Sequence, residues 1–149
     1  MLEGLAEGGR MQRSPADWSL TLFQKRINME RSNAPWLVHP HPGYLRDQRW
    51  YAKKHPRELA AVMRNLERYL NLLALAPDPR ALQAGFIHPE KHGMIALDQR
   101  GSDGHLQPTR LYCFAQVRTQ RVHLFGLGDK SGQAADLARL APIAQALNS

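Results

Sequence analysis

The side chains best suited to chemistry on a phosphate are Arg110 and Lys130. Arg110 is the second residue of an alternating segment, and alternation places it on one face with Tyr112 and Phe114. An arginine between two aromatic residues is not typical of a solvated face, and its planar guanidinium suits a phosphate. Lys130 lies in GLGDKSG, just before a predicted helix whose first N–H groups can bind an anion. Both are candidates for phosphate binding, against the alternative that each is an ordinary surface residue.

His123 is a candidate acid or base, because an imidazole titrates near neutral pH. It shares one face of the predicted strand 121–127 with Arg121, a candidate for substrate binding. The alternative for His123 is a half-buried structural histidine.

Two histidine pairs raise the possibility of a metal site. They are His39-x-His41 and His88-x-x-x-His92, and each offers two imidazoles. Pro89 follows His88, so the second pair is not expected on one helical face, and neither pair has a clear third ligand nearby in the sequence. We therefore predict no metal site and no cofactor.

The composition favours an acidic partner such as nucleic acid or an acidic protein segment. The 149 residues hold 20 Lys and Arg against 13 Asp and Glu, and 15 of the basic residues are Arg. The single cysteine, Cys113, excludes an intramolecular disulfide and a multi-cysteine zinc site. No apolar run approaches the length of a membrane helix, and residues 1–10 do not resemble a signal peptide, so we expect a cytoplasmic protein.

Apolar periodicity predicts the elements that must position these residues. It predicts a strand at 36–39, helices at 43–54 and 56–73, strands at 93–99, 109–115 and 121–127, and a helix at 133–147. Pro142 should kink or split the last helix. The order indicates an α+β fold: an N-terminal strand and a helical hairpin packed on a small twisted antiparallel sheet of about four strands, with a C-terminal helix. We expect the helices to pack on one face of that sheet.

The chain divides into an N-terminal extension, residues 1–35, and one domain, residues 36–149. The extension has three glycines among its first ten residues, is nearly neutral, and holds one short amphipathic stretch at 18–29. The domain carries most of the net positive charge. The basic side of the helical hairpin could follow a phosphate backbone, or it is a solvated helix face. Its basic residues are Arg46, Arg49, Lys53, Lys54, Arg57, Arg64 and Arg68.

Residues 36–149 resemble the RelE/ParE toxin superfamily. The matching features are HPHPGYL after the first strand, the helical pair, the strand GMIAL, and Thr109-Arg110-Leu111-Tyr112, which matches the family's recurrent strand motif. The apolar strand VHLFGLGDK and a helix follow in the family's order. The resemblance rests on the order and spacing of these pieces together.

The resemblance implies the toxin of a type II toxin–antitoxin pair, neutralised by a cognate antitoxin in a hetero-oligomer. A RelE-like or HigB-like member cuts messenger RNA on the ribosome without a metal, and a ParE-like member inhibits DNA gyrase instead. A degenerate member would be a binding module. For cleavage, the resemblance implies that Arg110 clamps the phosphate and Lys130 takes a basic catalytic position, with His123 available for proton transfer.

The resemblance also implies that basic residues near the strand at 93–99 contact the substrate. The candidates there are Lys91, His92 and Arg100. Asp98 stands where the family commonly has an arginine, which is a departure from its pattern. Lys53 and Lys54 are further candidates for RNA contacts.

Overall fold

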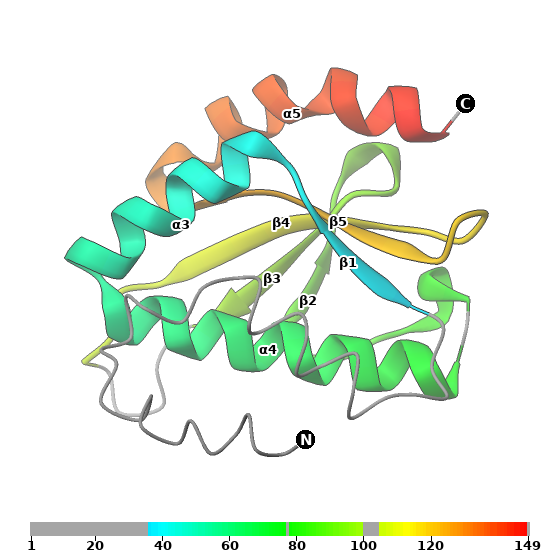
Figure 1. Cartoon of the computed structure of the whole chain (residues 1–149), viewed down its shortest axis with the longest axis horizontal. Coiled ribbons are helices and arrows are strands. Elements are labelled where there is room, and N and C mark those ends of the chain that lie inside the picture. Colours follow the sequence, from blue (N-terminus) through cyan, green and yellow to red (C-terminus); the bar gives the residue numbers. More distant parts are fainter. Residues whose placement is uncertain (1–35, 77, 100–104, 149) are drawn as a thin grey trace, which may run out of the picture.

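The computed structural model describes residues 36–76, 78–99 and 105–148, which form the expected α+β fold (Figure 1). The elements are, in chain order, β1 (Leu37–Pro40), α3 (Pro42–Lys54), α4 (Pro56–Leu75), η3 (Pro79–Ala81), β2 (Ile87–Pro89), η4 (Lys91–Gly93), β3 (Ile95–Gln99), β4 (Thr109–Gln116), β5 (Arg121–Gly128), η5 (Lys130–Gly132) and α5 (Gln133–Asn148). The predicted stretch 18–29 and Arg100 lie outside the described residues.

One mixed sheet joins the five strands in the order β1-β5-β4-β3-β2. The strands β2 to β5 pair antiparallel, as their short links predict, whereas β1 pairs parallel with β5. The short strand β2, which periodicity does not reveal in three residues, adds to the expected four. Because β1 is an edge strand beside β5, residues about 80 positions apart in the chain become neighbours.

The helix α4 supplies much of the core on one face of the sheet. It begins at Pro56, where a proline costs no helical hydrogen bond, and α3 likewise begins at Pro42. Each fully buried leucine on α4 stabilises the fold by about 1.5–3 kcal/mol. The buried apolar residues of α4 in this core include Leu59, Val62, Leu66, Tyr69, Leu70 and Leu73. No helix within the described ranges has the length and apolar character needed to cross a membrane.

The helices cover both faces of the sheet, which corrects the expectation of one covered face. Figure 1 shows α5 on the side of the sheet opposite α4. Leu140 and Ala144 of α5 form a second core with Tyr112 and Phe114 of β4. Both faces are covered because β4 is apolar on both, with Leu111, Cys113 and Ala115 directed to the first core. The helix α5 runs through Pro142 without being split.

The single cysteine lies in the first core. Cys113 is fully buried, and burial raises the pKa of its thiol well above the usual range. Burial therefore favours the protonated thiol and shields it from solvent, which is typical of a structural cysteine.

Candidate functional site

A pocket of about 480 Å³ lies where the end of α3 meets the start of β4 and the loop after β5. We call it the β4 pocket. Its lining combines aromatic, basic and hydroxyl side chains, a mixture typical of sites that orient a polar ligand against an apolar wall. The lining residues are Trp50, Tyr51, His55, Gln107, Pro108, Thr109, Asp129, Lys130 and Ser131.

The aromatic wall of the β4 pocket comes from the last turn of α3. Trp50 is 50% exposed, although a large apolar side chain is normally buried. Its ring contacts Tyr51 edge-on at 5.0 Å between centroids and His55 at 5.3 Å. Burial raises the pKa of Tyr51 to about 12, with nearby carboxylates adding to the effect, so its hydroxyl stays protonated. The wall thus offers an exposed indole held in place by two neighbouring rings.

The opposite wall of the β4 pocket is the loop that enters α5. The carboxylate of Asp129 accepts hydrogen bonds from the Ser131 hydroxyl at 2.6 Å and the Gly132 N–H at 3.1 Å, and these bonds lower its pKa. Asp129 therefore caps the turn η5. This cap holds the exposed Lys130 at the pocket. Lys53 and Lys54 are exposed in the last turn of α3, the helix end that carries the aromatic wall.

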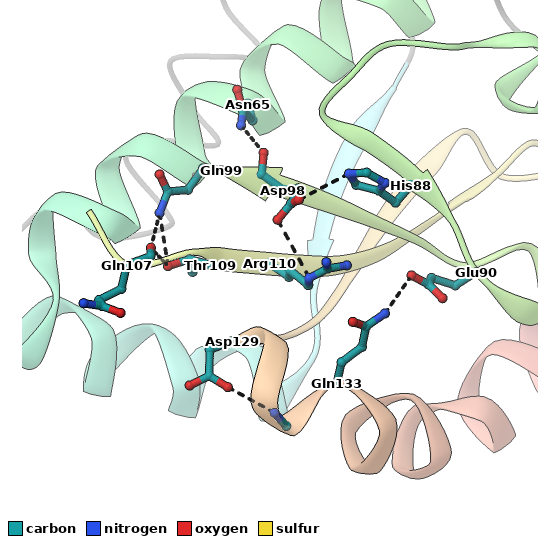
Figure 2. A network of polar contacts seen from close by, with 11 residues as sticks. Asn65, His88, Glu90, Asp98, Gln99, Gln107, Thr109, Arg110, Asp129 and Gln133 are labelled. Atoms are coloured by element: carbon teal, nitrogen blue, oxygen red, sulfur yellow. Dashed lines mark hydrogen bonds and ion pairs between the residues drawn. The ribbon is translucent and has the colours of Figure 1, made fainter. Parts of the chain in front are cut away.

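Arg110 is paired with an acid (Figure 2) and does not line the β4 pocket. It follows Thr109, which lines the pocket, and it pairs across the sheet with Asp98 on β3. Its Nε is 3.8 Å from Asp98 Oδ1, and the two side chains are 12% and 4% exposed. The other carboxylate oxygen of Asp98 is 3.2 Å from His88 Nε2. Asp98 thus takes up part of the Arg110 charge.

The terminal amino groups of Arg110 remain available. Within the described residues they make no hydrogen bond, and Figure 2 shows the guanidinium extending on the side of the sheet where α5 begins, near Gln133. The hydroxyl of Tyr112 on the same strand face is also without a hydrogen bond in that part of the chain. Burial raises the pKa of Tyr112 above the usual range, with Asp136 adding to the effect. Arg110 therefore offers positive charge on the face of β4 opposite the pocket residue Thr109, although the acids around it reduce that charge.

His123 belongs to a separate group of three imidazoles, His39, His41 and His123, which we call the histidine cluster. The ring centroids are 5.0 Å apart for His39 and His41, 5.0 Å for His39 and His123, and 5.1 Å for His41 and His123. Nε2 of His41 lies 2.9 Å from Nδ1 of His123. His39 is exposed, His41 is half-buried and His123 is buried, so the cluster opens to solvent at His39.

Burial favours the neutral form of the His41 and His123 imidazoles. Burial lowers the pKa of His123 to about 4, and repulsion from His41, His39 and Arg121 adds to the effect. Burial, with repulsion from His39, also lowers the pKa of His41. Neutral imidazoles keep a lone pair on one ring nitrogen, which a proton or a metal ion can share.

The structure does not bring the predicted catalytic residues together. Lys130 lines the β4 pocket, and Arg110 pairs across the sheet with Gly128, two residues before Lys130. His123 instead pairs with Phe114, four residues along β4 from Arg110, or about 13 Å at the rise of a strand. The three residues therefore do not form one catalytic centre.

The predicted substrate-binding residues are also spread over the surface. Lys91 and His92 lie in η4, where the His92 carbonyl accepts a hydrogen bond from Asn148 near the end of α5. Arg121 is exposed at the start of β5, close to the histidine cluster. Among the members of this group that the structure describes, only Lys53 and Lys54 lie next to the β4 pocket.

The sequence reasoning missed two contributions to these sites. The sequence analysis gives Trp50 and His55 no functional role. The signal that could have indicated one is the aromatic pair Trp50-Tyr51 followed by two lysines at the end of a helix, because aromatic rings and cations together bind single-stranded nucleic acid. The prediction of no metal site also missed the third imidazole, because His123 is 82 positions from His41 and only the β1–β5 pairing joins them.

In comparisons with known proteins, no family model, no curated protein and no solved structure matches this chain.

Proposed function

We propose that the β4 pocket binds single-stranded RNA and that the protein is a RelE-like toxin, a ribosome-dependent endoribonuclease of the cytoplasm that a cognate antitoxin neutralises. One observation carries the proposal: an exposed indole and the ammonium group of Lys130 line the same pocket. Single-stranded RNA is bound by stacking its bases on aromatic rings and pairing its phosphates with cations. The toxin class rests on the resemblance carried by Thr109-Arg110-Leu111-Tyr112 and the order of the elements.

The proposed reaction is a transesterification that needs no metal. The 2′-hydroxyl attacks the adjacent phosphorus while the bond to the 5′-oxygen breaks, leaving a 2′,3′-cyclic phosphate and a free 5′-hydroxyl. One proton leaves the 2′-oxygen and one reaches the 5′-oxygen, so a single imidazole can relay it. His55 in the pocket has the right chemistry for this relay. Lys130 would stabilise the charge that builds on the phosphate oxygens, and Arg110 would add to the local positive charge from the other face of β4.

A second candidate is a ParE-like gyrase inhibitor that binds without catalysis. It is favoured by the ion pair between Arg110 and the buried Asp98, because a cation already paired with an acid is a weaker phosphate clamp. A catalytically degenerate binding module fits the same observation.

Induction of the full chain in a bacterial host separates these functions. We expect incorporation of labelled amino acids to fall before incorporation of labelled thymidine, because translation is the proposed target. Lys130→Gln should restore growth, since it removes the cation of the pocket. Arg80→Gln is the matched control, because Arg80 is exposed in η3 and pairs with Asp78. Replication falling first would favour the gyrase inhibitor, and normal growth with abundant protein would favour the binding module.

Trp50→Ala should weaken binding of the purified protein to a fluorescent single-stranded RNA by about 5- to 150-fold. This range corresponds to the 1–3 kcal/mol that stacking of one base on an aromatic ring contributes. Fluorescence anisotropy at fixed salt measures the affinity, and Trp50→Phe should retain much of it. Leu75→Ala is the control, because Leu75 is 84% exposed at the end of α4. Equal affinity in the Trp50→Ala protein would exclude the aromatic wall as the base-binding surface.

A further inference from the structure

We propose that the histidine cluster is a zinc site in which His39, His41 and His123 supply three imidazole ligands. The site is independent of the β4 pocket, because His123 pairs with Phe114 while the pocket lies at Thr109, at the other end of β4. One candidate ligand atom from each histidine can be chosen so that all three atoms lie within 4.8 Å of one another. The three ring centroids form a nearly equilateral triangle, with sides of 5.0, 5.0 and 5.1 Å, as expected for rings around a common point.

The sheet itself builds the cluster. His39 and His41 are two residues apart at β1, a spacing that places both side chains on one face. The parallel pairing of β1 with β5 sets His39 directly beside His123. The backbone N–H of His41 donates to the Leu124 carbonyl at 2.9 Å, which extends this register past the end of β1. Backbone hydrogen bonds rather than loop positions therefore hold the three imidazoles together.

Gln116 fixes which nitrogen of His123 faces the cluster. Its side-chain N–H donates to the Leu147 carbonyl at 3.1 Å, and its side-chain oxygen accepts from the Thr119 hydroxyl at 2.6 Å. The orientation of the amide is therefore set by both partners. Nε2 of His123 lies 2.9 Å from this oxygen and must donate to it, so the lone pair of His123 is on Nδ1. That nitrogen is the one that faces His41.

This arrangement is typical of the outer partners of zinc sites. A metal-bound histidine usually donates its second N–H to a carbonyl or carboxylate, which orients the ring. Two nitrogens bound to one tetrahedral zinc are about 3.3 Å apart, as follows from zinc–nitrogen bonds of 2.0–2.1 Å. The 2.9 Å between His41 Nε2 and His123 Nδ1 is slightly shorter, and no pair in the chosen set of atoms exceeds 4.8 Å. Small side-chain rotations suffice to admit the ion, with His41 moving its proton to the other ring nitrogen.

The chemistry of the ligands favours zinc with one open position. Three imidazoles leave the fourth tetrahedral position to water, as in zinc sites that are not purely structural. Solvent reaches this position because His39 is exposed, whereas the buried His123 closes the inner side. Phe125 packs edge-on against His41 at 5.0 Å between centroids, so part of the wall is apolar.

Zinc titration of the full chain, purified without a histidine tag, tests the site. Isothermal titration calorimetry should show one zinc ion per chain, and Co²⁺ at the same site should give the intense visible absorption of tetrahedral coordination. His39→Asn should weaken zinc binding by more than about 100-fold, since even the loss of an outer partner costs 10- to 100-fold. His39 is exposed, so this variant is expected to fold.

His92→Asn is the matched control. His92 is exposed with φ of 61°, a backbone conformation that asparagine tolerates well. The proposal requires that His92→Asn bind zinc like the unmodified chain and that His39→Asn and His123→Gln not do so. Equal zinc affinity in His39→Asn, or no tetrahedral Co²⁺ spectrum from the unmodified chain, would overturn it.

Discussion

Replacing Phe125 by alanine should lower the free energy of unfolding by about 4 kcal/mol, in the range measured for buried phenylalanines. Phe125 is 1% exposed and belongs to the core that holds α5 on the sheet. Its ring also contacts His41 at 5.0 Å and His123 at 6.3 Å between centroids. The vacated space would therefore loosen both α5 and the histidine cluster. Urea unfolding followed by circular dichroism measures the loss.

Phe125→Leu is the control, because it keeps the site apolar and nearly filled. We expect it to cost less than about 1.5 kcal/mol. A loss below about 1 kcal/mol for Phe125→Ala would mean that the second core collapses around the cavity, and that α5 depends little on this ring.

Arg110→Met should lower the free energy of unfolding by about 3 kcal/mol, the lower end of the range for breaking a buried ion pair. The methionine keeps the length of the side chain but leaves the carboxylate of Asp98, which is 4% exposed, without this cation. The lower end applies because His88 Nε2 remains 3.2 Å from the same carboxylate. Urea unfolding at pH 7 provides the measurement.

The double variant Asp98→Asn with Arg110→Met separates stability from function. It removes both charges, so at least half of the lost stability should return. If Arg110 contacts RNA, the double variant should be well folded and still non-toxic in the induction experiment. Restored toxicity would instead show that Arg110 serves only to neutralise Asp98. Full stability of Arg110→Met alone would contradict the burial argument.

The sequence by itself determines most of the secondary structure. Helical spacing of apolar residues fixes α4, and period-two alternation fixes β4 and β5, because these patterns report which face of a local element is buried. Alternation also places Arg110 on the strand face of Tyr112, opposite Leu111, as the two cores confirm. An element of only three residues, such as β2, carries too little of the alternating pattern to be recognised.

The tertiary structure alone decides which side chains meet. The pocket that joins Trp50 to Lys130 depends on how α3 lies against the sheet, and the pairing of Asp98 with Arg110 depends on the β3–β4 register. The β4–β5 register separates His123 from Arg110, and the parallel pairing of β1 with β5 places His123 beside His39. Periodicity describes one element at a time, whereas strand order and register arise from contacts between distant parts of the chain. The residue types could therefore be predicted as reactive from the sequence, but their grouping into a pocket and a histidine cluster could not.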